Sequence, residues 1–508
     1  MADTVCLGSP IGLQDFLAVA RGGAQVDFSE DYRSRVDRSR ALVERWIAQG
    51  RVMYGITTGF GALCGQVISP EETALLQRNI VLSHAVSVGE PMTAEQVRGT
   101  LLMMLQNLGQ GYSGVRLETL ELIRQVLNRG VVPYAPREGS VGYLAPEAHM
   151  ALVLIGEGQA TVGGRLLPGR EALASVGLEP MVLSSKEGLA LVSGTTSVTA
   201  LGALALADLL NCARAADLIG AMSLEVLKGT TKAFGPELMS VRPHGDQQAV
   251  AGNVRRILAD SQRAQANVDT RLQDALSLRC IPQLHGAARK TLQDALVTLE
   301  TEMNACCDNP ILWPEGEDGR AISGCNADSA YVGLAMDCAA IAGTLLAKMS
   351  ERRNNRLIDG NLSGYPWFLI SRPGLNSGMM IPQYTQAGLL NDMKILCHPA
   401  TPDGIPTCGN QEDYVAMGYN ASKKAVQIAE KLEYVLAIEL LSVIQAQQFT
   451  EDGLQPGAAT AAVLAELSEL VPPLQADAFL HPMIAGIRDM LHSGRLVAVA
   501  EAAAGPIA

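Results

Sequence analysis

The longest helical pattern in the chain limits its possible folds more than any other feature. It runs from about Gln411 to Phe449 and contains EDYVAMGYNASKKAVQIAEKLEYVLAIELLSVIQAQQF. At a rise of 1.5 Å per residue, a helix of roughly 40 residues spans about 60 Å. Because its apolar residues occur on more than one face, such a helix must pack against several others. The pattern predicts either a very large bundle or an oligomer whose helices share a core, and we favour the oligomer.

Two further long patterns predict a mainly α-helical fold. They run from about Leu284 to Asn304 and from Ala330 to Leu357. Of the 508 residues, 48% are hydrophobic but only 4% are aromatic, so the core is expected to consist mostly of aliphatic side chains. The first part of the chain instead alternates short helical patterns with Gly- and Pro-containing loops. We therefore predict a loop-rich N-terminal region at 1–186 and a long-helix bundle at 187–508.

The charge and the apolar segments exclude several kinds of partner. A formal net charge of −13 disfavours nucleic acid and anionic membranes, which select for basic surfaces. The stretch 188–210 approaches transmembrane length, but Ser193, Thr195, Thr196 and Asp208 interrupt it, so we expect a buried helix. The start of the chain has no signal-peptide pattern, and the ten cysteines lack zinc-type spacing. We expect a cytoplasmic protein with reduced thiols, no metal and no membrane partner.

Four polar residues lie in surroundings that call for an explanation. His84 lies in the apolar run RNIVLSHAVSVG, where a histidine is usually a hydrogen-bonded core residue. Tyr54 lies in YGITTGFG, which on its own predicts a glycine-rich turn. Arg279 lies between apolar residues in QDALSLRCIPQLHGAAR and needs a carboxylate from the protein or from a substrate. Glu412 is expected at the start of the longest helix, where N-terminal capping would also explain it.

Together these segments resemble the aromatic amino acid lyases, the family of histidine and phenylalanine ammonia-lyases. Further matching motifs are KEGLAL, SLEVLKGT, RPHGDQQAVAGNVR, DNP, SERR, GLNSGMM and IPTCGNQED. The match covers almost the whole chain. It implies an ammonia-lyase/fumarase-like bundle of long helices and a homotetramer whose active sites take loops from more than one subunit.

The resemblance also implies roles for residues that would act on the amino-acid part of a substrate. Tyr54 matches the family's tyrosine base, Arg279 the arginine that holds the substrate carboxylate, and Gln273 a nearby polar ligand. Lys394, in NDMKILCHP, is a candidate for activating or reprotonating groups, although a solvated lysine at a helix end is the more usual explanation.

A second group of matching residues concerns the substrate ring. The pair Ser83-His84 and the acid Glu412 match the histidine-type members of the family, in which these residues address an imidazole ring. Phenylalanine-type members carry apolar or amide groups at these places. The resemblance therefore implies a substrate that bears an imidazole.

The segment EGSVGYLAPEAHM departs from the family pattern at the position of its electrophile. Family enzymes read approximately SVGASGDLAP, and their Ala-Ser-Gly condenses into a methylidene-imidazolone that captures the substrate amine. Here Gly142 is followed directly by Tyr143. Either the tripeptide is absent from the protein, or a matured cofactor is left out of the printed sequence.

Changes at neighbouring positions favour a true absence. Ser193 replaces an asparagine that hydrogen-bonds the cofactor, Leu276 a loop tyrosine, Ala327 a phenylalanine beside the cofactor, and Thr57 an asparagine of the glycine-rich loop. We therefore expect no cofactor, and we expect Ser193, Tyr143 and Ala327 to line the substrate site.

A site without the electrophile suits a substrate whose leaving group needs no activation. A trimethylammonium group has no lone pair to add to an electrophile, and it departs as neutral trimethylamine. The sequence thus predicts a lyase similar to the ergothionase subgroup, which eliminates trimethylamine from a histidine betaine (ergothioneine or hercynine) to give the (thio)urocanate. Tyr54 would remove the β-proton. One alternative is a histidine ammonia-lyase that uses the methylidene-imidazolone to convert L-histidine into urocanate and ammonia. The other is a non-catalytic binding or assembly protein.

Overall fold

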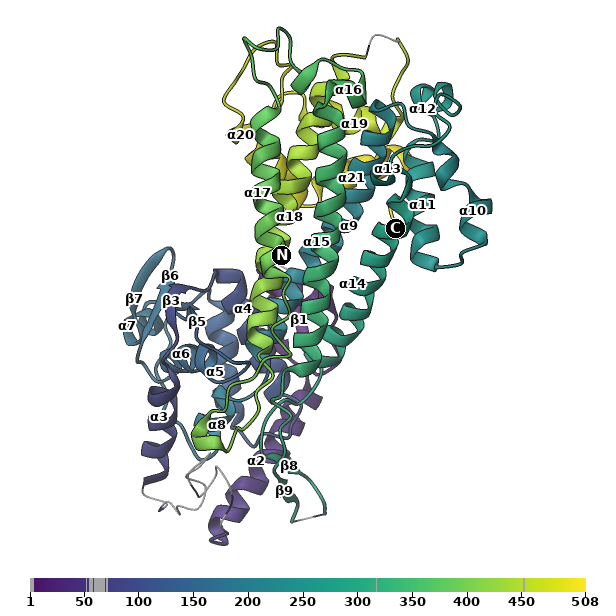
Figure 1. Ribbon diagram of the computed structural model, residues 1–508. Coiled ribbons are helices and arrows are strands. Elements are labelled where there is room, and N and C mark those ends of the chain that lie inside the picture. Colours follow the sequence, from purple (N-terminus) through teal and green to yellow (C-terminus); the bar gives the residue numbers. More distant parts are fainter. Residues whose placement is uncertain are drawn as a thin grey trace. The chain divides into compact units, whose positions relative to one another are not determined.

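The computed structural model describes residues 4–508 except 52, 54–57, 59–68, 70, 71, 317, 451 and 452 (Figure 1). Its residues form two compact units, each assembled from three stretches of the chain. Unit 1 comprises Met1–Leu204, Leu296–Asp337 and Pro399–Lys423, and unit 2 comprises Ala205–Ala295, Cys338–His398 and Lys424–Ala508. The sequence predicts one division near residue 186. In the structure, stretches of the two units alternate along the chain instead, because the longest helices have residues in both units.

Four helices with residues in both units are α9 (Thr196–Val226), α14 (Ile281–Met303), α15 (Ala330–Ile358) and α18 (Gly418–Gln447). The remaining helices of unit 1 are α1 (Leu13–Ala20), α2 (Glu30–Ala48), α3 (Thr73–His84), α4 (Ala94–Leu108), α5 (Leu117–Asn128), α6 (Ala145–Leu154), α7 (Gly169–Ser175), α8 (Glu187–Val192) and the 3₁₀ turn η5 (Cys408–Asn410). Those of unit 2 are η3 (Thr231–Phe234), α10 (Pro236–Ser240), α11 (Gly245–Ile257), α12 (Gln262–Ala266), α13 (Leu276–Arg279), α16 (Gly360–Ser363), η4 (Trp367–Leu369), α17 (Met380–Leu396), α19 (Ala458–Leu467), α20 (His481–His492) and α21 (Arg495–Ala504). The predicted mainly α-helical fold is confirmed.

The described strands all belong to unit 1 and form small sheets. They are β1 (Thr4–Leu7), β2 (Gln25–Phe28), β3 (Val88–Pro91), β4 (Val132–Pro133), β5 (Pro136–Glu138), β6 (Gln159–Val162), β7 (Arg165–Pro168), β8 (Ile311–Trp313) and β9 (Arg320–Ile322). β1 pairs with β2 in parallel, whereas β3–β5, β4–β6–β7 and β8–β9 are antiparallel. In the β3–β5 pair Val88 lies opposite Glu138, so the chain that follows α3 runs beside the loop that follows β5.

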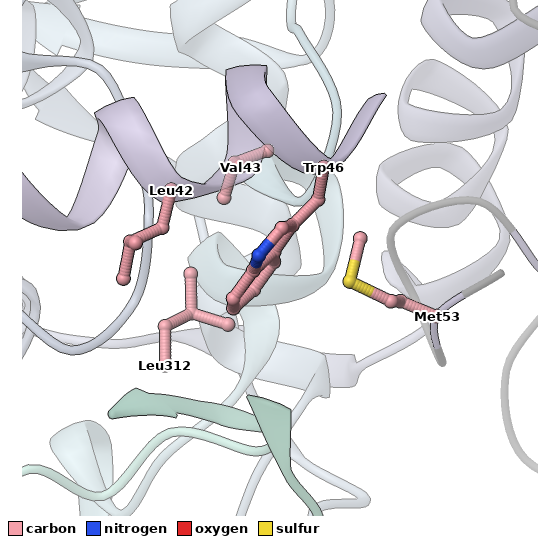
Figure 2. Packing of buried hydrophobic residues seen from close by; sticks show 5 residues of the cluster. All are labelled: Leu42, Val43, Trp46, Met53 and Leu312. Atoms are coloured by element: carbon pink, nitrogen blue, oxygen red, sulfur yellow. The ribbon is translucent and has the colours of Figure 1, made fainter. Parts of the chain in front are cut away.

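A hydrophobic cluster packs α2 against the β8–β9 hairpin. Figure 2 shows its members, which are Leu42, Val43, Trp46, Met53 and Leu312. Trp46 is completely buried, and its indole Nε1 donates a hydrogen bond of 2.8 Å to the carbonyl oxygen of Asp318. Burial of an aromatic ring whose polar group is satisfied fixes both the depth and the orientation of α2 in this core.

In unit 2, parts of the long helices run side by side and share buried charges (Figure 1). Asp217 of α9 accepts hydrogen bonds from His285 Nδ1 at 2.8 Å and from Arg289 Nη2 at 2.9 Å, both on α14. Arg353 of α15 forms a bidentate pair with Glu439 of α18, at 2.6 and 2.9 Å. These hydrogen-bonded ion pairs are buried, so they fix how α9 is aligned along α14 and how α15 is aligned along α18.

The structure confirms two of the predicted long helices and corrects the third. α14 and α15 cover the patterns that begin near Leu284 and at Ala330. α18 begins only at Gly418, so the predicted start at Gln411 is wrong. Preceding residues turn away from a helical path: Thr407 forms a β-bridge with Glu412, and Met417 has a φ of +51°. A non-glycine residue in the left-handed region interrupts a right-handed helix.

Two described helical stretches are long and apolar enough in composition to cross a membrane. They are Glu187–Val226 and Ala330–Ile358, and their most apolar windows are 100% and 61% buried within the protein. The first contains the apolar stretch expected as one buried helix. It is broken between α8 and α9, where Gly194 has a φ of +109°. Burial of this kind is typical of core helices in a large bundle.

Candidate active site

A cavity of about 550 Å³ lies in unit 1. Its walls come from the end of α3, the loop after β5, the first turn of α6, the end of α8 and two loops near residues 325 and 410. Six residues singled out in the sequence line it, namely Ser83, His84, Tyr143, Ser193, Ala327 and Glu412. The fold thus brings together residues that are as much as 329 positions apart (412 − 83).

Backbone contacts fix the segment at the start of α6. Ser140 Oγ donates to the carbonyl oxygen of Tyr143 at 3.2 Å, and the Leu144 amide donates to the carbonyl oxygen of Val192 at 3.0 Å. Leu144 has a φ of +80° and a ψ of −64°, a conformation that a branched residue rarely adopts. Such conformations persist only where the surrounding structure enforces them, and they are frequent at functional sites.

Glu412 is held at the cavity wall by Thr407. The Thr407 hydroxyl donates to Glu412 Oε2 at 2.6 Å, and the Thr407 amide donates to the Glu412 carbonyl oxygen at 2.8 Å. Glu412 lies six residues before the first residue of α18, so capping of that helix does not explain it. Its half-buried carboxylate is therefore oriented by a neighbouring hydroxyl and faces the cavity.

Tyr143 lies next to this carboxylate. Burial is the largest cause that raises the pKa of the Tyr143 phenol, and the negative charge and hydrogen bonding of Glu412 raise it further. A phenol with a raised pKa keeps its proton at neutral pH and is a hydrogen-bond donor. Tyr143 is thus suited to pair with an acceptor and unsuited to remove a proton.

His84 is the last residue of α3 and is half-buried. Its Nδ1 lies 2.7 Å from the carbonyl oxygen of Ile80 and 3.1 Å from Ser83 Oγ. Because a carbonyl oxygen can only accept, Nδ1 carries the hydrogen, and in the neutral ring Nε2 is then an acceptor. Burial, the largest cause, lowers the pKa of His84, which favours this neutral form; the nearby charge of Glu412 opposes the shift.

Ser193 and Ala327 form a buried part of the cavity wall. Ser193 is 7% exposed and follows the last residue of α8, and Ala327 is 6% exposed. The chain after Ser193 is anchored by Thr195, which donates to Glu302 Oε1 at 2.5 Å, and by Thr196, which donates to Glu147 Oε1 at 2.8 Å. These bonds fix the N-terminus of α9 behind the cavity wall.

Three candidate residues belong to unit 2. Arg279 ends α13, and its guanidinium contacts the side chain of Gln273, whose amide oxygen accepts from Nη1 and Nη2 at 2.9 Å and from Nε at 3.1 Å. The Arg279 Nε also lies 3.0 Å from the carbonyl oxygen of Asp274. Lys394 lies exposed in the last turn of α17. Tyr54 and Thr57 lie outside the described residues.

Several lining residues were missed in the sequence. Thr407, Asn309, Cys325 and Cys408 all line the cavity. Thr407 and Asn309 occur within the motifs IPTCGNQED and DNP, so their segments were noticed, although no role was assigned to them. Only the turn that returns the chain from Thr407 to Glu412 reveals that these two side chains are partners.

Comparisons with known proteins show which family this chain resembles. The family model described as aromatic amino acid lyase matches residues 11–469. A histidine ammonia-lyase from Symbiobacterium thermophilum is 46% identical over 99% of this chain and 100% of its own length. A crystal structure of histidine ammonia-lyase from Trypanosoma cruzi has a TM-score of 0.92 at 35% identity and covers 98% of this chain and 95% of its own. An ergothionase structure from Treponema denticola is as similar in fold, with a TM-score of 0.91, but is only 26% identical over 97% of this chain and 100% of its own.

These relatives correct two predictions. The predicted elimination of trimethylamine from a betaine is contradicted, because relatives that are 41–46% identical over most of their length are named histidine ammonia-lyase. The predicted absence of a cofactor is contradicted by the same relatives, because histidine ammonia-lyases use the methylidene-imidazolone group. The changes at Ser193, Tyr143 and Ala327 therefore do not indicate an ergothionase.

The segment that forms this group in the family does not fit the group in this chain. Gly142 and Tyr143 are consecutive, and no Ala-Ser-Gly lies between Ser140 and Ala145. A Cβ atom placed on Gly142 would lie 2.4 Å from Ser329 Oγ, so the backbone here is already in close contact with its surroundings. We therefore assign no chemical step to the methylidene-imidazolone. The extent of the family match and of the full-length similarity nevertheless identifies the chain as a member of the aromatic amino acid lyase family.

Proposed function

We propose that the protein is a carbon–nitrogen lyase that releases ammonia from an imidazole-bearing amino acid, with L-histidine as substrate and urocanate as product. The observation that carries the proposal is that two hydrogen-bond acceptors suited to an imidazole, Glu412 and neutral His84, line one cavity. The names of the full-length relatives support the same reaction.

The ring-binding part of the proposal follows from donors and acceptors. An imidazolium ring offers two N–H donors, and a phenyl ring offers none. The Glu412 carboxylate would accept from one ring nitrogen, and His84 Nε2 would accept from the other or from a bridging water. A phenyl ring in the same place would donate no hydrogen bond to either acceptor, which makes its binding free energy less favourable than that of an imidazole. The cavity should therefore prefer histidine to phenylalanine.

The amino-acid part of the substrate would be held by residues taken from the family resemblance. We assign Arg279 to the substrate carboxylate, with Gln273 beside it, and Tyr54 to removal of the β-proton. The electron pair of the broken C–H bond forms the C=C bond, while the C–N bond breaks and the amino group leaves as ammonia. Arg279 suits this role because its planar guanidinium can bind both carboxylate oxygens. Lys394 has no assigned step.

The proposal includes a cytoplasmic homotetramer. The nine described cysteines, all of those outside the masked residues, are free thiols, as expected in a reducing compartment.

Product analysis with purified protein tests the proposal. L-Histidine and L-phenylalanine are supplied separately, and ammonia and the ultraviolet absorbance of the unsaturated acids are followed. Urocanate and ammonia from L-histidine, with little cinnamate from L-phenylalanine, are the expected result. Faster release of cinnamate, or no ammonia from either amino acid, would overturn the assignment.

A further inference from the structure

Tyr143 occupies a fixed position at the edge of the cavity. It directly follows Gly142, whose φ of +148° and contact with Ser329 leave little freedom to the backbone. The Ser140 hydroxyl and the bond between Leu144 and Val192 fix the chain on both sides of it. The backbone position of Tyr143 is therefore set by the fold, independently of any ligand.

Glu412 is the acidic partner within reach of this side chain. Both residues line the same cavity, and Glu412 contributes to the raised pKa of the Tyr143 phenol through its charge and through hydrogen bonding, after the larger contribution of burial. Glu412 also accepts from Thr407 at 2.6 Å. Two residues with hydroxyl groups thus line the cavity together with this carboxylate, from segments more than 260 residues apart (407 − 143 = 264).

We propose that Tyr143 is a positioning residue whose phenol donates a hydrogen bond to Glu412 and, together with Thr407, holds the carboxylate aimed at the ring of the substrate. The substrate class named here rests on the proposed function above. Because a carboxylate has about four acceptor positions, two bound hydroxyls leave room for a ring N–H.

This arrangement would determine specificity as well as affinity. Without the phenol, Glu412 could turn within the cavity and would accept less well from a ring at a fixed position. Hydrogen bonds to charged groups are stronger than those between neutral groups, and the loss of one is expected to weaken binding by about tenfold or more. A ligand with a phenyl ring makes no bond to Glu412 and should be insensitive to Tyr143.

The experiment measures binding of two planar product analogues, urocanate and cinnamate, to the purified full-length protein by titration calorimetry. The variants are Tyr143→Phe and, as a matched control, Tyr414→Phe. Tyr414 also lies by a carboxylate, that of Asp328, but it is 57% exposed and does not line the cavity. Tyr143→Phe should lower the affinity for urocanate about tenfold and keep the affinity for cinnamate within about twofold of the unmodified protein. Tyr414→Phe should change neither affinity.

A second pair of variants keeps the test decisive if Tyr143→Phe fails to fold. Thr407→Val removes the other hydroxyl and should also lower the affinity for urocanate without lowering that for cinnamate. Thr407→Ser retains a hydroxyl, so its affinity for urocanate should be close to that of the unmodified protein. An unchanged ratio of urocanate to cinnamate affinity in Tyr143→Phe, or an equal loss of both ligands, would overturn the positioning role. If the unmodified protein itself does not prefer urocanate, the proposed function fails, and this inference fails with it.

Discussion

Glu147, in the first turn of α6, accepts a 2.9 Å hydrogen bond from the backbone amide of Ser197 near the N-terminus of α9. The carboxyl group is completely buried, and its Oε2 has no hydrogen-bond partner among the described residues. Burial, the largest cause, raises the pKa of Glu147 above its usual value near 4.5, although the bonds from Ser197 and Thr196 oppose the shift. The group is therefore more easily protonated in the folded state than in the unfolded state.

This difference predicts how stability depends on pH. Below pH 4.5 the carboxyl group is protonated in both states, so its raised pKa does not lower the free energy of unfolding. As the pH rises from 4.5 towards the folded-state pKa, the unfolded state loses this proton more readily than the folded state, and the free energy of unfolding falls. Glu147→Gln imitates the protonated acid. It should therefore raise the thermal unfolding midpoint more at pH 8 than at pH 5. Glu90→Gln, at an exposed glutamate, is the control and should change the midpoint little at both values. A larger gain at pH 5 would refute the raised pKa.

The buried pair Arg353–Glu439 predicts a large loss of stability. Both side chains are 0% exposed, so Arg353→Met would leave an unpaired buried carboxylate, at a cost of about 3–5 kcal/mol. The control is Lys290→Met, which breaks the exposed pair with Asp294 and should cost less than about 1 kcal/mol. Chemical denaturation of both variants provides the comparison, and equal small losses would show that the buried pair is not structurally important.

Arg279→Lys should lose most of the activity. A lysine retains the positive charge but cannot bind both oxygens of a carboxylate in one plane. We expect kcat/KM for L-histidine to fall at least about tenfold, as hydrogen bonds to charged groups imply. The control is Arg320→Lys, at a surface arginine that is 62% exposed, and its kcat/KM should equal that of the unmodified enzyme. If Arg279→Lys has a kcat/KM within twofold of the unmodified enzyme, Arg279 does not bind the substrate carboxylate.

Glu412→Gln should change the selectivity for the ring more than the stability. The amide keeps the shape of the side chain and its oxygen can still accept from Thr407, but the charge that attracts an imidazolium is lost. KM for L-histidine should rise about tenfold or more, while the unfolding midpoint stays within a few degrees. If KM is unchanged, the ring does not contact Glu412.

Much of the fold could be predicted from helical periodicity. The patterns beginning near Leu284 and at Ala330 correspond to α14 and α15, because their buried faces repeat over many turns. The start of α18 could not be predicted in this way. The turn at Met417 and the bridge between Thr407 and Glu412 depend on contacts that a local pattern does not contain.

The candidate site shows a similar division. Sequence motifs singled out His84, Tyr143 and Glu412, and these line one cavity, but the motifs gave no partner for Glu412. Thr407 is a common residue in a loop, and only the fold reveals its bond to this carboxylate. The substrate prediction was wrong because the missing tripeptide before Tyr143 and the changes at Ser193, Leu276, Ala327 and Thr57 do not outweigh the similarity to histidine ammonia-lyases along the whole chain.

A crystal structure of the protein with bound urocanate tests the proposed substrate site most directly. We expect the imidazole ring in the cavity of unit 1, with one ring nitrogen within about 3.2 Å of a Glu412 carboxylate oxygen and the other facing His84, directly or through a water. A ring bound outside this cavity, or bound within it without contact to Glu412 and His84, would refute the proposed site.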